Sequence, residues 1–481
     1  MPAKLIDQTD TKLTIQFTVD LTGQMLKDEQ SLQESLNEAG QVAMEPMIKQ
    51  FDTHGEPIRV NGIKHTVKDY APQTYETPYG SVCVQRHTYQ TSKGGRAYVP
   101  LEEDSRMVLN STPRYAQIVS GKYARFGADS IREDLLECNG RDISRNYAKK
   151  LSDFVGTIAQ FHESEWAYEL PEFEQPVCSI TLGLDGTCML MQQDGWREAM
   201  CGSITFYDSQ GERLHTIYCS ATPEYGKERF KDKFAREIER VKQRFPDVLY
   251  VGLADGAKDN WTFLKTYTKR LLLDFYHARE YIGKAASAIF GRDKINKKIW
   301  EDKFSHDLKH KQGTAARLIN ELEIQRANLD KKNFIERDEE IRQVITYYKN
   351  HRDKMSYARH LKENLPIGSG VTEAACKTLI KQRMCISGSR WKEDGASCVL
   401  ALRTLKLTTG RWPQFWSYVM RHGCTLFYAN TQLKFCKSFI RITFQGNGPH
   451  GKEKSWSDDL RYENNKFLKK PRFNHRLFRV C

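Results

Sequence analysis

Residues 181–190, TLGLDGTCML, decide how the second half of the chain is interpreted. Apolar residues lead directly to Asp185. An unpaired charge next to a buried strand is costly, so such groups are normally paired or bind metal. The Asp-Gly pair is also a strong signal for a hairpin turn. Two interpretations stay open here, a turn or a metal-binding carboxylate at the end of a strand.

The segments around this stretch predict a particular order of elements. Residues 177–185 favour a strand, and two more strands flank the turn sequence DSQG. An amphipathic helix over 227–245, a buried strand near 250, a short helix and the strand RLLLDFY follow. The order βββαβαβ predicts a mixed five-stranded sheet with helices on its faces. It is the order of an RNase H-like α/β core.

The rest of the chain divides by composition. Helical and charged sequence between the last strand and the motif NLPIGSG predicts an all-α insertion, and the N-terminal part predicts an α+β region. The expected segments are a helical region (1–57), a small β-hairpin module (58–105), a helical region (106–160), the core (175–280 and 363–425), the insertion (281–362) and a basic tail (426–481).

Residues 106–160 contain a helix, an Asn-Gly turn and a second helix for which Ser144 is the expected N-cap. The second helix carries Arg145, Asn146 and Lys149. A short helix, a tight turn and a basic second helix are typical of a DNA-reading helix-turn-helix. The alternative is an ordinary helical hairpin with a solvated basic face.

The whole chain has 481 residues and a formal net charge of +13, which suits a polyanionic partner such as nucleic acid. No run of about 18 apolar residues is present, and the first residues lack the apolar core of a signal peptide, so we expect a cytoplasmic protein without membrane contact. The 12 cysteines include no C-x-x-C pair, so we expect reduced thiols rather than a common zinc motif.

Two further acids, Asp255 and Glu373, are candidates for the same metal site as Asp185. Asp255 ends the apolar run YVGLAD, and in the expected sheet its strand is parallel to that of Asp185 and about 4.8 Å away. Two such carboxylates repel unless a cation bridges them, and hard oxygen donors suit Mg²⁺. Glu373 follows a Pro- and Gly-rich break, in the first turn of a helix. Its alternative role is an ordinary helix-start acid paired with Lys377.

Four blocks of sequence resemble one known family. They are GLDGT, LADGAKDNW, DFYHAREYIGKAA and LPIGSGVTEAACKTLIKQRMCISGSRWKEDGASCVLALRTLKL. Their order and spacing are similar to those of bacterial insertion-sequence transposases of the ISKra type, relatives of the Mutator-like superfamily. That superfamily carries Cys or Asp, two residues and His after the second aspartate, which Asp274 and His277 match. The resemblance covers roughly residues 20–430.

The resemblance implies a DDE transposase that cuts transposon ends and joins them to target DNA. Asp185, Asp255 and Glu373 would be the catalytic acids and metal ligands, holding two Mg²⁺ per site, with Mn²⁺ as a substitute. His277 would support the acids or contact DNA, unless it is a core histidine. Asp259 and Asp274 are competing acids, because they lie close to the proposed site.

The resemblance also implies contacts to DNA. Trp391 would stack on a base near the cleavage site, unless it packs in the core. Arg383 and Arg390 would suit phosphates. Relatives carry cysteine pairs near the N-terminal strands, whereas this chain has only Cys83 there, so we expect a hairpin module without zinc.

The implied partners are terminal inverted repeats and target DNA, bound by a homodimer or a higher synaptic complex associated with the bacterial nucleoid. Two other functions stay open. A domesticated transposase would bind DNA without catalysis and would not need the three acids. An RNase H-like nuclease would share the sheet and metals without needing the long insertion.

Overall fold

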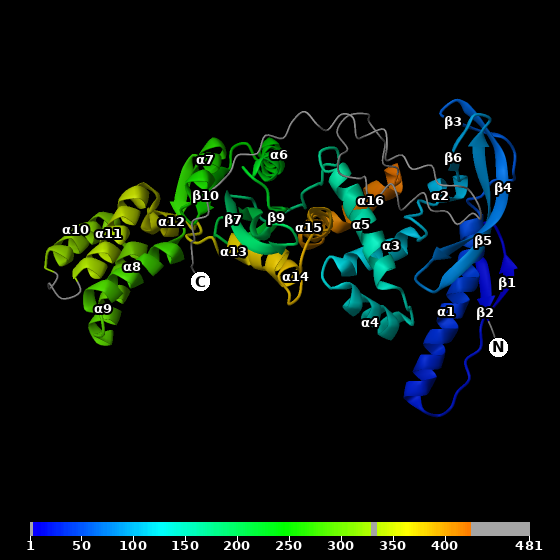
Figure 1. Cartoon of the computed structure of the whole chain (residues 1–481), viewed down its shortest axis with the longest axis horizontal. Helices are drawn as coiled ribbons and strands as arrows, with labels where there is room; N and C mark the ends of the chain where they lie inside the picture. The colour runs from blue at the N-terminus through cyan, green and yellow to red at the C-terminus, as the bar shows by residue number, and fades with distance from the viewer. Residues whose placement is uncertain (1–2, 329–333, 425–481) are drawn as a thin grey trace. The chain divides into compact units, whose positions relative to one another are not determined.

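The computed structural model describes residues 3–328 and 334–424. A mixed five-stranded sheet lies at the centre of the second half of the chain (Figure 1). Its order is β11-β10-β7-β8-β9, with β10 parallel to both neighbours and the other pairs antiparallel. The strands are β7 (Ser179–Met191), β8 (Gly195–Tyr207), β9 (Arg213–Ala221), β10 (Leu249–Ala254) and β11 (Arg270–Leu273).

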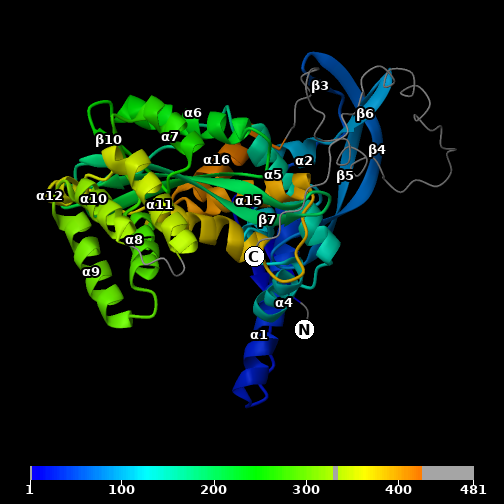
Figure 2. The same cartoon turned by 60° about the vertical axis from the view of Figure 1, so that its left-hand side comes forward.

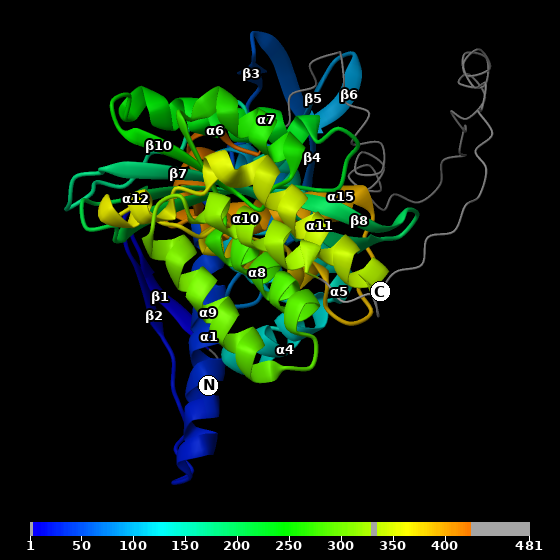
Figure 3. The same cartoon turned by 90° about the vertical axis from the view of Figure 1, so that its left-hand side faces the viewer.

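Helices cover both faces of this sheet, as the long buried runs of its strands predict. On one face lie α6 (Glu228–Arg244) and α7 (Lys258–Tyr267) (Figure 3). The apolar residues of α6 recur at helical spacing, and Phe234 packs where Gly202 has no side chain. On the other face lie α13 (Gly370–Ala375) and α15 (Glu393–Leu407). The predicted order βββαβαβ is therefore confirmed.

A helical segment separates β11 from α13, as expected for residues 281–362, but it begins earlier, with the helix that follows β11 directly. Its helices pack with the sheet in one hydrophobic core. They are α8 (Phe275–Phe290), α9 (Lys294–His310), α10 (Thr314–Ala327), α11 (Phe334–His351) and α12 (Tyr357–Lys362).

The helical region 106–160 forms α3 (Pro113–Tyr123), α4 (Ala128–Asn139) and α5 (Arg145–Phe161). Ser144 caps α5 as predicted, since its hydroxyl accepts from the Tyr147 amide at 3.1 Å. These helices share a second hydrophobic core with the part of β7 and β8 nearest their connecting turn, with α15 and with α16 (Arg411–His422). One face of α5 is therefore buried, which the helix-turn-helix prediction did not include.

The N-terminal prediction of a helical region over 1–57 is partly wrong. A hairpin of β1 (Lys4–Gln8) and β2 (Leu13–Gln16) precedes the long helix α1 (Met25–Lys49), which is drawn in blue in Figure 2. The strands are short and largely exposed, so they lack the buried apolar alternation by which strands are recognised. The next strands form a four-stranded antiparallel sheet: β3 (Ile58–Val60), β4 (Ile63–Glu76), β5 (Ser81–Thr91) and β6 (Gly94–Tyr98).

The basic tail predicted for 426–481 lies outside the described residues. Within residues 3–328 and 334–424, none of the helices combines the length and apolar character that crossing a membrane requires.

Candidate active site

Asp185 does not end a strand, contrary to the sequence prediction. It lies inside β7, which continues to Met191, and Gly186 pairs with Met200 in the β7–β8 ladder. The Asp-Gly turn is therefore wrong as well, since the chain reverses only at residues 192–194. The carboxylate is half-buried, and its Oδ1 accepts a hydrogen bond from the Gly186 amide at 2.7 Å.

Asp255 follows β10 directly, as predicted. The last parallel pair between β10 and β7 joins Leu253 to Gly183. Continued by two residues, this register sets Asp255 beside Asp185, on the same face of the sheet, because paired residues share a face. The half-buried Asp255 carboxylate accepts from the Ala257 amide at 3.3 Å.

Asn260 connects the strands that carry these two acids. Its side chain is 6% exposed, and its Nδ2 lies 3.4 Å from both the Leu184 carbonyl oxygen and Asp255 Oδ1. One amide group thus donates to β7 and to the carboxylate after β10. This residue was not predicted from the sequence, although its place in the first turn of the helix after Asp255 was a usable signal.

Asp274 continues the row of acids at the end of the next strand. Ala254 pairs with Leu273, so the same register sets Asp274 beside Asp255. The Asp274 side chain is fully buried and caps α8, since its Oδ1 accepts from the His277 amide at 2.8 Å. Its Oδ2 accepts from the Ser369 amide and lies 2.9 Å from the Ser369 hydroxyl oxygen. These donors hold the carboxylate in place and occupy much of its capacity to bind a metal.

Glu373 lies in the first turn of α13, as predicted. Its Oε1 accepts from the Ser369 hydroxyl at 2.8 Å, and the same hydroxyl lies 2.9 Å from Asp274 Oδ2. The suggested i,i+4 pair with Lys377 is not found: Glu373 lies instead 4.0 Å from His277 Nε2. Ser369 therefore links the glutamate to the buried aspartate, a role that was not predicted from the sequence.

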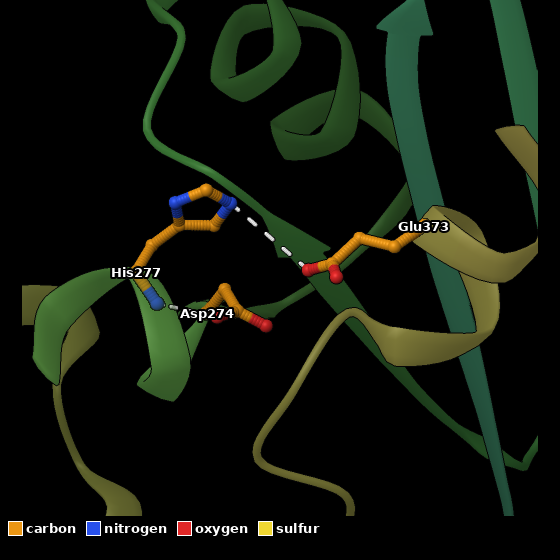
Figure 4. Close-up of side chains that lie close together, drawn as sticks. All are labelled: Asp274, His277 and Glu373. Carbon is orange, nitrogen blue, oxygen red and sulfur yellow. Dashed lines mark hydrogen bonds and ion pairs between the residues drawn. The ribbon is translucent and has the colours of Figure 1, made fainter. Parts of the chain in front are cut away.

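His277 is not a core histidine, because its side chain is 37% exposed. It lies in the first turn of α8, and Figure 4 shows its ring directed toward Glu373 above the Asp274 carboxylate. Asp274, His277 and Glu373 each offer one ligand atom, and these atoms lie within 4.8 Å of one another. The three residues therefore form a possible metal-binding group.

A pocket of about 760 Å³ joins these features. Asp185, His277 and Glu373 line it together with Lys377 and Lys381. Burial raises the pKa of Asp185, and the negative charges of Asp255 and Glu373 raise it further. Three of the four predicted catalytic residues thus line one pocket, and the fourth acts electrostatically on Asp185.

The competing acid Asp259 is exposed in the first turn of α7 and does not line this pocket. The oxygens that remain free for a cation are those of Asp185, Asp255 and Glu373, since each accepts few hydrogen bonds from the protein. Such an all-oxygen set fits a hard divalent cation, whereas the His277 nitrogen is better suited to transition metals.

The residues predicted to read DNA lie exposed on the first turns of α5: Arg145, Asn146 and Lys149. They line a hollow of about 750 Å³. Arg145 pairs with Asp129 at 2.7 Å, and Lys149 pairs with Asp153.

Arg383 does not lie where a phosphate can reach it. Its side chain is 4% exposed, and its guanidinium lies over the rings of Tyr123 and Trp391. The phosphate contact predicted for Arg383 is therefore not supported, because the guanidinium is enclosed by aromatic rings. Arg390 is exposed and forms no ion pair with any residue of the described ranges.

Trp391 is half-buried and joins the core of the helical region. Its indole N–H donates to the Met384 carbonyl at 2.8 Å, and its backbone pairs with the β7 end of the long hairpin. With Arg383 over its ring, its role in the structure is packing, which was the alternative to base stacking.

No protein-family model matches the chain, and a search of curated proteins finds no match.

Proposed function

We propose that the protein is a metal-dependent DDE transposase with an RNase H-like catalytic core. The observation that carries the proposal is that acids about 70 and 188 residues apart from Asp185 in sequence gather around it: Glu373 lines the same pocket, and the β7–β10 register sets Asp255 beside it. Acids so far apart in the chain have no local structural reason to gather. Their shared electrostatic field is what a divalent cation would relieve.

The topology supports the same core. In an RNase H-like sheet the first and fourth strands are neighbours and parallel, which is the relation between β7 and β10. A helical segment between the second aspartate and the glutamate agrees with the resemblance of the sequence to ISKra-type transposases.

The reaction would be phosphoryl transfer at a DNA phosphodiester. Two Mg²⁺ held by Asp185, Asp255 and Glu373 would activate the attacking oxygen and stabilise the leaving one. Asn260 and Ser369 would keep the carboxylates in position through the hydrogen bonds described above. Lys377 and Lys381 line the pocket without an ion pair in the described part of the chain, which suits a phosphate-rich substrate.

The same residues serve two steps. With water as the attacking group, one DNA strand is cut at the transposon end, leaving a 3′-hydroxyl. With that hydroxyl as the attacking group, the end is joined to target DNA. Both steps displace one oxygen at phosphorus in line with the other, so a single site performs both.

Strand cleavage tests the proposal. A DNA duplex that carries the inverted repeats flanking the gene is incubated with the full chain and Mg²⁺. We expect nicking and joining by the wild type, and loss of both in Asp185→Asn, Asp255→Asn and Glu373→Gln. Asp259→Asn removes an acid outside the pocket and serves as the matched control, which should keep wild-type activity.

The outcomes separate the alternatives. Full activity in any of the three variants would remove that residue from the catalytic set. Cleavage without joining would favour an RNase H-like nuclease, since the acidic pocket alone suits either reaction. Repeat binding with no metal-dependent chemistry in the wild type would favour a non-catalytic DNA-binding protein.

A further inference from the structure

The four-stranded sheet of β3 to β6 ends in two hairpin turns. β3 and β4 join through Asn61 and Gly62, whose φ angles of 50° and 79° fit the tight type I′ turn. β5 and β6 join through residues 92–93. Because Thr66 at the start of β4 pairs with Gln90 at the end of β5, both turns lie at the same end of the sheet.

The other end of this sheet is fixed in place. There, β4 and β5 supply Tyr75, Val82 and Val84 to a small hydrophobic core with Ile48 of α1. Figure 1 shows α1 against this end and β3 and β6 toward the opposite end. The two turns therefore lie at the free end of a hydrogen-bonded sheet whose other end packs against α1.

Five cations gather around the turns, and we name this surface the hairpin end: Arg59, Lys64, Lys68, Lys93 and Arg96. All five are exposed. None of them forms an ion pair with another residue of the described chain, although 28 such pairs are found there. Some exposed cations elsewhere, such as Arg244 and Lys349, have acidic partners, whereas five unpaired cations lie together here.

The pairing register sharpens this point. Arg59 lies directly opposite Lys64 on the neighbouring strand. Like charges at directly opposite positions destabilise a sheet. The strands of this sheet contain two acids: Glu76 lies at the anchored end and pairs with Arg141, and Asp69, the neighbour of Lys68, forms no ion pair within the described chain, so five cations face one free acid. An anion from outside the chain would relieve this repulsion.

The shape of the β-sheet at the hairpin end favours double-stranded DNA as the anion. Two antiparallel strands form a ribbon that enters the major groove of DNA, which is about 12 Å wide. Lysine and arginine at its edges would reach phosphates on either side of the groove, and Thr66 and Gln90 between them are polar. Among the described residues of the hairpin end, the exposed large apolar side chains are Ile63 and Val67, which lie among lysines, and this small apolar area disfavours a lipid surface.

We propose that the hairpin end binds the sugar–phosphate backbone of double-stranded DNA, outside the catalytic pocket. The inference rests on the proposed function for the identity of the substrate, but not on the acids. Backbone contacts carry no sequence information, so this surface would hold a duplex while other residues select it.

The test compares the salt dependence of DNA binding for full-length variants. Fluorescence anisotropy gives the Kd of a repeat-containing duplex and of a scrambled duplex at about 50 to 200 mM salt. For Lys64→Ala/Lys68→Ala/Lys93→Ala we expect weaker binding to both duplexes by the same factor. The slope of log K against log salt should fall by about 0.9 for each phosphate that the variant no longer neutralises. Circular dichroism checks that the variant is folded.

The matched control is Arg244→Ala/Lys349→Ala/Arg359→Ala, which lowers the net charge equally but removes cations that already pair with glutamates. A similar loss of affinity in this control would overturn the inference, because net charge alone would then explain the effect. Unchanged binding by the hairpin variant, or binding of the hairpin end to anionic vesicles but not to DNA, would also overturn it.

The outcome of this DNA-binding experiment does not depend on the outcome of the strand-cleavage experiment. A wild type that cleaves DNA while the hairpin variant binds normally would refute the surface and leave the proposed function standing. A wild type that cuts no DNA while the hairpin variant loses affinity would refute the proposed function and support the surface.

Discussion

Gly183 of β7 lies against Thr372 of α13 so closely that a Cβ atom on the glycine would overlap the threonine hydroxyl. The hydroxyl also lies 2.7 Å from Ser203 Oγ on β8. Thr372 immediately precedes Glu373, and Gly183 is two residues before Asp185. This close approach therefore fixes the distance between the helix and the strand that carry the two acids.

Gly183→Ala should disturb this packing without removing any acid. Overpacking of this kind typically costs about 1–3 kcal/mol of folding free energy, and moving α13 away from β7 would separate Glu373 from Asp185. We expect a lower midpoint in urea unfolding and a loss of Mg²⁺-dependent cleavage larger than the loss of DNA affinity. Gly395→Ala, in α15 at a position where an added Cβ atom has open space and the φ angle is not positive, is the control for glycine replacement. Wild-type cleavage by Gly183→Ala would show that the close approach is not required.

Asp185 should make the protein sensitive to pH. Its pKa is raised by burial and then by Asp255 and Glu373, so the folded state disfavours its charge. Stability linked to this group is therefore greatest when it is protonated, and is lost as pH rises through the raised pKa. We expect Asp185→Asn to raise the melting temperature of the metal-free protein at neutral pH and to abolish the further rise that Mg²⁺ produces in the wild type.

The same shift predicts the pH profile of catalysis. Metal binding needs the ionised carboxylate, so activity should fall with decreasing pH at a higher pH than an aspartate of ordinary pKa would cause. Activity as a function of pH, at two Mg²⁺ concentrations, checks this. A profile that does not move with metal concentration would contradict competition between protons and Mg²⁺.

Asn260 should act as a positioning residue for Asp255. Asn260→Ala removes the amide that donates to Asp255 and to the Leu184 carbonyl, and such supporting partners typically contribute about 10–100-fold to metal affinity or activity. We expect a higher Mg²⁺ concentration for half-maximal cleavage, with DNA affinity unchanged. Asn260→Asp should be worse than alanine, because it sets a second carboxylate against Asp255. Equal metal requirements in all three proteins would exclude this role.

Ser369 should control the orientation of Glu373. Its hydroxyl has one proton and two carboxylate neighbours, Asp274 and Glu373, so it can donate to only one at a time. Ser369→Ala removes this link and should lower kcat at saturating DNA, while Ser369→Thr keeps the hydroxyl and should restore much of the activity. A threonine variant as weak as alanine would indicate a purely steric role.

Arg145 and Lys149 test the prediction that α5 reads the transposon ends. Arg145→Ala/Lys149→Ala should reduce gel-shift affinity for the repeats more than affinity for unrelated DNA, because both residues are exposed at the start of α5. Arg244→Ala/Lys349→Ala removes the same charge elsewhere and serves as the control. Unchanged affinity for the repeats would remove the assignment of α5.

The sequence by itself determined the order of strands and helices in the core. Strands that are buried on both faces consist of long apolar runs, and such runs can be recognised in the sequence. It also determined where two of the acids lie: Asp255 directly after the apolar run of β10, and Glu373 in the first turn of the helix after a Pro- and Gly-rich break. It failed where local signals conflict, as at Asp185 and Gly186, whose turn propensity is overridden by pairing with β8.

Only the tertiary structure decided which neighbours each acid has. Ser369, which contacts Glu373, also contacts Asp274, 95 positions earlier in the chain. The burial of Arg383 depends on rings supplied by α3 and by the loop before α15. Such neighbours depend on the register of strands and the approach of helices. These are set by packing across the whole core, so they leave no periodic pattern in the sequence from which they could be predicted.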